Sequence, residues 1–253
     1  MTTNAETTDY SQLSRSDLIY LSRLYERAEK FDEMVQCINY FVKLNPKLNI
    51  DERNILSAGY KNIIATKRFS WRYLMNQSKK EEKNKNTLAV SYINEIKSRV
   101  EDEIKKICLD INTLLDNHLI PSTDDIEFKV YFLKLKADYF RYLCEFTTNE
   151  EFEASLNNAE KAYKDAYELG EQSLPISSTT RLGTALNYSV LLFEIKNLRE
   201  EASKIAKTSL DEGLKILDDL EKNKQKDTIL IIQLLMENLI LWNTEEKEDL
   251  FQE

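Results

Sequence analysis

Residues Asp51–Lys80, DERNILSAGYKNIIATKRFSWRYLMNQSKK, predict part of one long helix, around which the rest of the chain can be arranged. They contain no Pro, and Asp51 suits the N-cap of that helix. At about 100° per residue, Lys61, Arg68 and Arg72 share one stripe of that helix. Three apolar residues fall on the opposite side, where a core-facing stripe is expected: Leu56, Ile63 and Leu74.

The cationic stripe stands in an acidic protein. No Asp or Glu lies between Arg53 and Lys80, although the whole chain carries a net charge of -9. A rigid basic face of this kind suits an anion-binding site, but it also decorates many solvated helices. The stripe by itself leaves both interpretations open.

Composition predicts an all-α protein with short connections. The 253 residues include only 4 Gly and 3 Pro, which is too little turn chemistry for a β-sheet protein. The length allows one large domain or two small ones. The prediction is a single helical domain, residues 16–243, between a polar tail, residues 1–15, and a short acidic tail, residues 244–253.

Apolar periodicity predicts about nine antiparallel helices with short loops. Their approximate ranges are 18–30, 32–44, 51–80, 87–117, 125–146, 148–170, 180–196, 198–220 and 227–242. Polar loops are expected near residues 79–86, 173–180 and 222–226. No 34-residue repeat is present, so a regular solenoid is not supported.

The cysteines and the ends of the chain indicate the compartment. Cys37, Cys108 and Cys144 stand among apolar helical neighbours, so free buried thiols in a reducing compartment are expected. Residues 1–17 lack the apolar region of a secretory signal, and no apolar run approaches the roughly 18 residues that span a bilayer. The expected location is the cytoplasm, with the nucleus left open. The acidic balance argues against nucleic acid as a partner.

No motif indicates an enzyme. The single histidine, His118, ends a predicted helix, where capping or solvation is its usual role. No His/Cys/Asp cluster has metal-ligand spacing, no Gly-rich loop precedes a Lys, and no Gly-x-Ser-x-Gly motif is present. We therefore expect no catalytic residue, no metal and no cofactor.

Three further helical faces combine polar and apolar residues within one sector. The first holds Lys134, Asp138, Arg141 and Tyr142; the second holds Leu186, Asn187, Val190 and Glu194; the third holds Leu230, Ile231, Leu234, Asn238, Leu241 and Trp242. Each also has an ordinary interpretation, because Lys134–Asp138 is a common surface pair and leucine stripes are usually core. Asn187 and Asn238 are harder to dismiss, since an Asn amid apolar residues needs hydrogen-bond partners.

Five motifs in order resemble the 14-3-3 family of phosphoserine/phosphothreonine-binding adaptors, from about Asp17 to Trp242. They are RNILSAGYKNI at 53–63, KRFSWR at 67–72, LKLKADYFRYL at 133–143, RLGTALNYSV at 181–190 and KDTILIIQLLMENLILW at 226–242. The resemblance implies a helical adaptor with an amphipathic peptide groove that clamps or occludes phosphorylated clients.

The resemblance also implies roles for individual residues. The phosphate would be bound by Lys61, Arg68, Arg141 and Tyr142, and the peptide backbone by Asn187 and Asn238. The apolar wall of the groove would comprise Leu186, Val190, Leu230, Ile231, Leu234, Leu241 and Trp242, with Arg72, Lys134 and Glu194 as secondary contacts. These residue types suit the ligand, because Arg, Lys and Tyr donate to phosphate oxygens and Asn both donates to C=O and accepts from N–H.

Dimerisation is a further implication. Lys30, Glu33, Arg99 and Glu103 keep the charge signs of the family's interprotomer salt bridges. A homodimer is expected, with a heterodimer with a paralogue left open. Ser70 matches a serine whose phosphorylation weakens the dimer in some relatives and is a candidate regulatory phosphosite. The family pattern is not matched at Phe69, Ala137, Met236 and Ile240, nor, as small departures, at Ile55 and Ala58, and this indicates a divergent member. The alternative is a helical scaffold that binds unphosphorylated segments.

Overall fold

The structure, a computed structural model, describes residues 9–223 and 225–250, except for the side chains of residues 220, 221 and 245–250. These residues contain helices and no strand, so the all-α prediction is confirmed for the described part of the chain. The chain divides into two compact units, Met1–Ser122 and Thr123–Glu253. The single domain over residues 16–243 stays a prediction.

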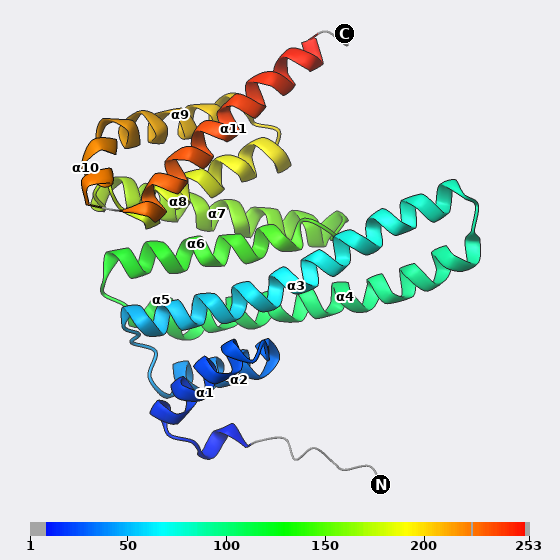
Figure 1. The fold of residues 1–253 in the computed structure, drawn as a ribbon, viewed down its shortest axis with the longest axis horizontal. Helices are drawn as coiled ribbons and strands as arrows, with labels where there is room; N and C mark the ends of the chain where they lie inside the picture. The colour runs from blue at the N-terminus through cyan, green and yellow to red at the C-terminus, as the bar shows by residue number, and fades with distance from the viewer. Residues whose placement is uncertain (1–8, 224, 251–253) are drawn as a thin grey trace. The chain divides into compact units, whose positions relative to one another are not determined.

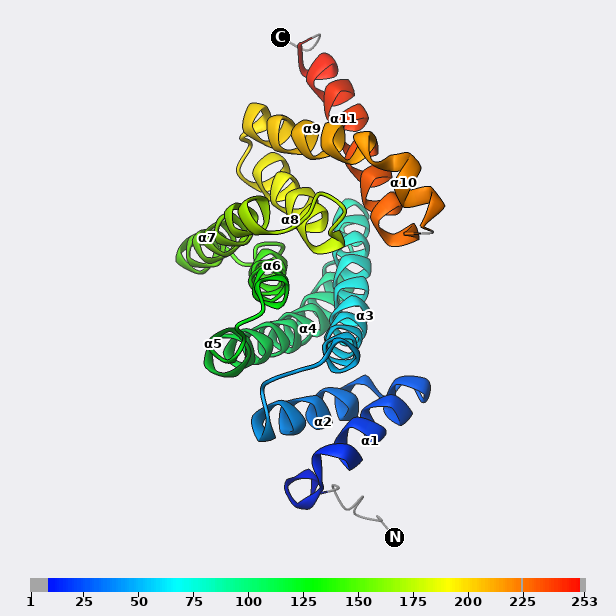
Figure 2. The ribbon, with the colours of Figure 1, turned by 90° about the vertical axis from the view of Figure 1, so that its left-hand side faces the viewer.

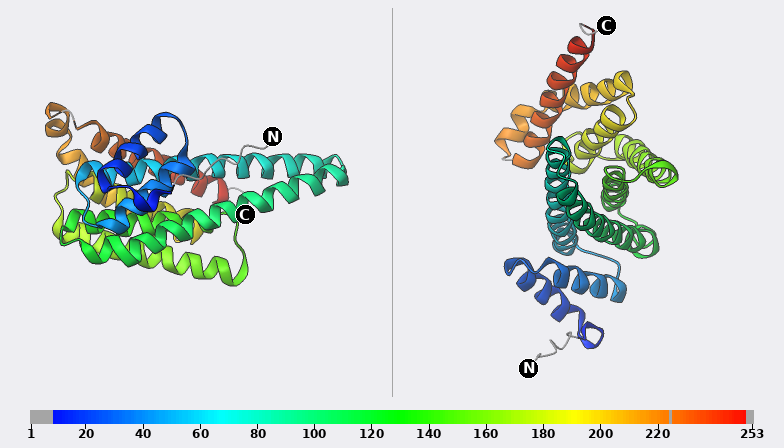
Figure 3. Two further views of the ribbon diagram at one scale, coloured as in Figure 1. Left: turned by 90° about the horizontal axis from the view of Figure 1, so that it is seen from below. Right: turned by 90° about the vertical axis from the view of Figure 1, so that its right-hand side faces the viewer.

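The first unit is built on a long helical hairpin (Figure 1). A short 3-10 turn, Tyr10–Gln12, precedes α1 (Arg15–Arg27) and α2 (Phe31–Leu44), which pack on α3 (Ile50–Lys83). Figure 3 shows α3 and α4 (Thr87–Leu114) running antiparallel along their length. A π-helical turn, Leu115–Leu119, and α5 (Ile120–Ser122) complete the unit.

The second unit stacks its helices in layers (Figure 2). It contains α6 (Ile126–Leu143), α7 (Asn149–Ser173), α8 (Thr179–Val190), a π-helical turn (Leu191–Ile195), α9 (Arg199–Lys215), α10 (Leu217–Lys222) and α11 (Lys226–Leu250). Helix α8 lies between α7 and α9 and also contacts α6 and α11. Its buried position explains why nine of its residues, including Thr184 and Ser189, have little exposed surface.

Local capping decides where α3 begins. The expected N-cap, Asp51, is wrong, because Asn49 caps the helix instead. The Asn49 side chain accepts a hydrogen bond from the Glu52 backbone N–H at 3.0 Å, and the Glu52 carboxylate accepts one from the Asn49 N–H at 3.0 Å. This reciprocal pair satisfies two of the N–H groups that a helix start leaves open. At its other end α3 continues to Lys83, into the predicted loop.

Two other predicted boundaries are wrong. The helix expected over 198–220 is interrupted at Ile216, three residues after Gly213. Glycine has low helix propensity, and here it allows close packing, since a Cβ at Gly213 would lie 2.8 Å from Cγ1 of Ile232. The helix expected over 227–242 continues to Leu250, because residues 243–250 contain neither Gly nor Pro.

Each unit has its own apolar core. The largest buried side chains of the first unit include Phe41, Met34, Leu56 and Tyr60. All three cysteines are free and buried, which confirms the prediction of free buried thiols, while the reducing compartment stays a prediction. Among the described helices, none combines the length and the apolar character that a membrane crossing requires.

Candidate functional site

The basic stripe lies on α3 in the first unit. Because α3 is continuous, Lys61, Arg68 and Arg72 share one face of it, with Lys61 and Arg72 exposed and Arg68 half-buried. On the opposite face Leu56 and Ile63 are buried and Leu74 is half-buried. The helix therefore holds three cations on a rigid scaffold at the predicted spacing.

A buried charge cluster lies in the second unit and centres on Asp138 of α6, which is 5% exposed. Asp138 Oδ2 accepts from Lys134 Nζ at 2.8 Å. Asp138 Oδ1 accepts from Asn187 Nδ2 of α8 at 2.7 Å and from the hydroxyl of Tyr163 of α7. The carboxylate thus joins three helices. We call Lys134, Asp138, Arg141, Tyr163 and Asn187 the Asp138 cluster.

Arg141 is held at the edge of this cluster. Its Nε donates to the Tyr163 hydroxyl at 3.2 Å, and its Cζ lies 5.1 Å from the ring centroid of Tyr142. Its terminal Nη1 and Nη2 form no hydrogen bond with the described residues of the second unit. The guanidinium is therefore oriented through Nε, and Nη1 and Nη2 keep the paired geometry with which a guanidinium can bind an anion.

The charges of the cluster depend on one another. Burial by itself would raise the pKa of the Asp138 carboxyl, but the charges of Lys134 and Arg141 and the hydrogen bonds from Lys134 and Tyr163 outweigh burial and lower it. Burial would likewise lower the pKa of Lys134, yet the Asp138 charge raises it. Burial and the Asp138 charge raise the pKa of Tyr163 well above its usual value. The cluster is thus a carboxylate held among two cations and a neutral phenol.

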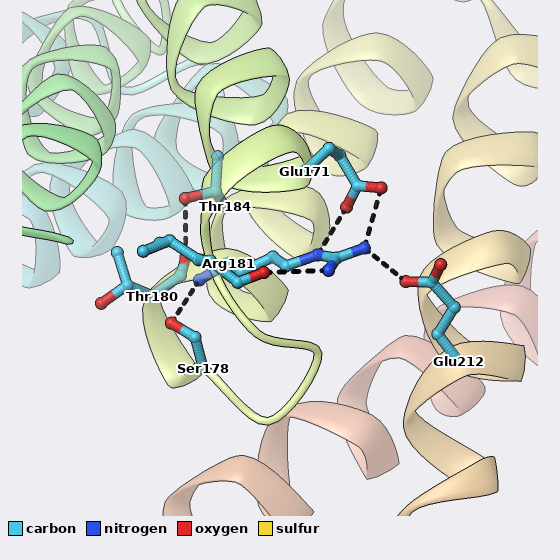
Figure 4. Close-up of polar contacts among 7 residues, drawn as sticks. Glu171, Ser178, Thr180, Arg181, Thr184 and Glu212 are labelled. Atoms are coloured by element: carbon cyan, nitrogen blue, oxygen red, sulfur yellow. Dashed lines mark hydrogen bonds and ion pairs between the residues drawn. The ribbon is translucent and has the colours of Figure 1, made fainter. Parts of the chain in front are cut away.

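A second buried ion cluster positions α8 (Figure 4). Arg181, 8% exposed, donates from Nε and Nη2 to the two carboxylate oxygens of Glu171 at 2.9 and 3.0 Å. Its Nη2 also donates to Glu212 at 2.7 Å, and its Nη1 donates to the Leu174 carbonyl at 3.1 Å. These bonds connect the start of α8 to the end of α7, to the link after it and to α9. They fix the helix that carries Asn187.

The apolar residues predicted for a groove differ in exposure. Leu230, Leu234 and Leu241 on α11 are exposed, whereas Leu186 is buried. Half-buried positions are Val190, Ile231 and Asn238, and Glu194 in the π-helical turn is exposed. Trp242 is only 2% exposed and stacks on Phe193, with ring centroids 4.4 Å apart and planes 9° apart. Its side chain packs in the core of the second unit.

Two of the residues predicted for a dimer interface, Arg99 and Glu103, have ion-pair partners within the chain. Glu103 pairs with Lys67 Nζ at 2.7 Å, and Arg99 pairs with Glu95 one turn earlier. Lys30 is exposed at the N-cap of α2, and Glu33 is half-buried in its first turn. The hydroxyl of Ser70 donates to the Thr66 carbonyl at 3.1 Å. Their interprotomer role and the modification of Ser70 stay predictions.

Sequence reasoning missed two features of the site. The ordinary interpretation of Lys134–Asp138 as a surface pair is wrong, because Asp138 is 5% exposed and accepts hydrogen bonds from Tyr163 and Asn187. Tyr163, which is fully buried and links Asp138 to Arg141, was not singled out from the sequence. His118 lies half-buried in the π-helical turn Leu115–Leu119. The described residues hold no group of three or more His, Cys, Asp or Glu that could bind a metal.

The sequence is similar to one family of known proteins over nearly its whole length. A family model described as 14-3-3 protein matches residues 21–243. The 14-3-3-like protein C of Glycine max is 41% identical over 239 residues, which cover 94% of this chain and 93% of the relative. The 14-3-3 protein 8 of Solanum lycopersicum is 42% identical over 239 residues, covering 94% and 92%. Checkpoint signal transducer rad25 of Schizosaccharomyces pombe is 41% identical over 232 residues, covering 92% and 86%.

Proposed function

This chain belongs to the 14-3-3 family, and from that premise we propose which of its residues bind a phosphorylated client. The family consists of non-enzymatic adaptors in signal transduction that bind phosphoserine and phosphothreonine and form dimers, so this chain is a phosphorylation-dependent adaptor. What remains to be assigned is the chemistry of recognition.

We assign phosphate binding to Lys61, Arg68, Arg141 and Tyr142, because these residues stand at the phosphate-binding positions of the family's motifs. A phosphoserine carries about −1.5 to −2 charges at neutral pH and offers three acceptor oxygens. Two guanidiniums can each form paired bonds to it, Lys61 adds a point charge and the Tyr142 hydroxyl adds a donor. The observation that carries this proposal is Arg141, whose Nε donates to the Tyr163 hydroxyl at 3.2 Å and so fixes the plane of the guanidinium, while no hydrogen bond joins its terminal nitrogens to the described residues of the second unit.

The peptide backbone is bound by Asn187 and Asn238, with Arg72, Lys134 and Glu194 as secondary contacts. The exposed leucines of α11 support an apolar wall, because they lie on the same helix as half-buried Asn238. That wall comprises Leu186, Val190, Leu230, Ile231, Leu234 and Leu241, with Trp242 behind it. Recognition of the main chain places few demands on client sequence, which suits an adaptor that clamps or occludes many clients.

The proposed working form is a homodimer in the cytoplasm. Lys30, Glu33, Arg99 and Glu103 would contribute interprotomer ion pairs, which give specificity more than affinity. Arg99 and Glu103 already have partners in the same chain, but these ion pairs do not prevent an interprotomer role. The carboxylate in each pair is more than half exposed, Glu103 at 51% and Glu95, the partner of Arg99, at 61%.

Fluorescence anisotropy tests the phosphate site. The probe is a labelled Arg-Ser-x-pSer-x-Pro peptide, compared with its unphosphorylated twin. We expect binding of the phosphorylated peptide alone, and loss of that binding in Arg68→Ala and in Arg141→Ala. Two charge-assisted bonds at about 1.5–3 kcal/mol each correspond to at least ~100-fold in Kd.

Matched measurements keep this result interpretable. Lys207→Ala removes an exposed cation from α9 and is expected to bind like the wild type. Far-UV circular dichroism should be the same for all variants. Equal affinity of the wild type for both peptides would refute the assignment and favour a scaffold that binds unphosphorylated segments.

A further inference from the structure

The orientation of the Asn187 amide is fixed by its neighbour. An ionised carboxylate can only accept hydrogen bonds, so the atom of Asn187 that lies 2.7 Å from Asp138 Oδ1 must be Nδ2, the donor. The amide oxygen of Asn187 then points to the other side. Asn187 is half-buried, so part of this side chain is exposed, and Oδ1 belongs to the side of the amide that Asp138 does not occupy.

Asp138 is itself held in place by several donors. Its carboxylate accepts from Lys134 on its own helix, from Tyr163 on α7 and from Asn187 on α8. Both oxygens are engaged, and the residue is 5% exposed. A buried, fully engaged carboxylate has one orientation, and it imposes one orientation on each group that donates to it.

We propose that Asp138 is a positioning residue that sets the Asn187 amide for recognition of a peptide main chain, with Oδ1 presented to a peptide N–H. This inference rests on the proposed function. It assigns Asp138 a role that phosphate binding alone does not require, because a negative charge beside Lys134 and Arg141 weakens their attraction for an anion.

The substitution Asp138→Asn tests whether Asp138 sets the orientation of the Asn187 amide. An amide has one oxygen, so it cannot accept from Lys134 on one side and from Tyr163 and Asn187 on the other. The ammonium of Lys134 forms the stronger, charge-assisted bond and takes that oxygen. The new NH2 group then faces Asn187, which must turn its own oxygen inward to accept. The peptide would meet an amide turned by about 180°.

Two ligands separate this role from phosphate binding. A labelled phosphopeptide of at least five residues engages both the phosphate and the main-chain contacts, whereas free phosphoserine lacks the flanking peptide groups. Asp138→Asn is expected to raise the Kd for the phosphopeptide about 10-fold, the equivalent of one or two hydrogen bonds. Its affinity for phosphoserine, measured by competition, should be unchanged or higher.

A double-mutant cycle with Asn187→Ala tests whether Asp138 acts through Asn187. We expect about 10-fold weaker phosphopeptide binding in each single variant and about the same 10-fold in the double variant, since both changes remove one contact. Asp165→Asn, an exposed position on α7, is the charge-matched control and should bind like the wild type. An additive loss of about 100-fold, or equal weakening toward phosphoserine, would overturn the proposal.

A measurement on the wild type does not depend on the variants folding. In side-chain amide NMR, with the Asn187 side-chain resonances assigned through their correlations to the Asn187 backbone in the wild type, one Nδ2 proton should be shifted downfield and slow to exchange. Two equivalent, rapidly exchanging protons would contradict a fixed amide. A wild type that does not distinguish the phosphopeptide from its unphosphorylated twin would instead refute the proposed function.

Discussion

Tyr163→Phe removes a single oxygen from the centre of the Asp138 cluster. That hydroxyl donates to Asp138 Oδ1 and accepts from Arg141 Nε at 3.2 Å. The ring would remain in place, because it is fully buried and stacks on Tyr188 with centroids 6.0 Å apart and planes 24° apart. The substitution therefore deletes two hydrogen bonds without opening a cavity as large as a side chain.

The expected cost follows from the charges of the two partners. A hydrogen bond to a charged group contributes about 1.5–3 kcal/mol, and two are lost here. Asp138 keeps Lys134 and Asn187 as donors, so its part of the loss is at the low end of that range. We expect the free energy of unfolding to fall by about 2–4 kcal/mol, or the Tm by about 5–15 °C, in urea and thermal denaturation.

Tyr188→Phe is the matched control. Tyr188 is 4% exposed, shares the ring stack, and its hydroxyl forms no hydrogen bond with the described residues. Its loss should change the free energy of unfolding by less than about 0.5 kcal/mol. The reasoning is refuted if Tyr163→Phe matches the wild type within that margin, or if both variants lose the same stability.

Arg181→Ala leaves the carboxylates of Glu171 and Glu212 without their shared cation. The free energy of unfolding, measured by thermal denaturation, should fall by about 3–5 kcal/mol, and Lys207→Ala should leave it unchanged. A loss below about 1 kcal/mol in Arg181→Ala would show that this ion cluster is dispensable. The lowered pKa of Asp138 means that the unfolded chain takes up its proton first, so the stability from this group is present above about pH 4 and disappears below it. Phosphopeptide affinity should weaken earlier, between about pH 7 and 5, as the phosphate gains its proton near pH 6; a constant Kd across that range would contradict a dianion-binding site. Burial raises the pKa of the Cys37 and Cys144 thiols to about 11, so neither should react with Ellman's reagent at pH 8 until denaturant is added, and rapid reaction of the native protein would contradict their burial.

The fold class could be predicted because it depends on composition and on local periodicity. Scarce Gly and Pro and regular apolar spacing determine an all-α chain, and they also place the basic stripe on one face of α3. The helix ends were less predictable. Asp51 and Asn49 are both good N-caps, and only the reciprocal bond between Asn49 and Glu52 decides between them.

The buried cluster could not be read from spacing alone. An i,i+4 pair such as Lys134 and Asp138 has the same pattern on a surface and in a core, and the difference lies in Tyr163 and Asn187, which are 25 and 49 residues from Asp138. Trp242 illustrates the same limit. Consecutive residues of a helix point about 100° apart, so Leu241 is 54% exposed while Trp242 is 2% exposed.

The π-helical turn after α8 restricts where the chain can gain or lose a residue. The Lys196 N–H bonds to the Leu191 carbonyl at 3.2 Å, five residues back, so this turn holds one residue more than an α-helical turn. Deleting one of residues 191–193 would close the turn to α-helical geometry and rotate Glu194 by about 100° relative to Asn187. The link at residues 174–178 is irregular and can change length with little effect on helical phase. At this turn, insertions and deletions are therefore more disruptive than most substitutions, and alignments of relatives should be gap-free across it.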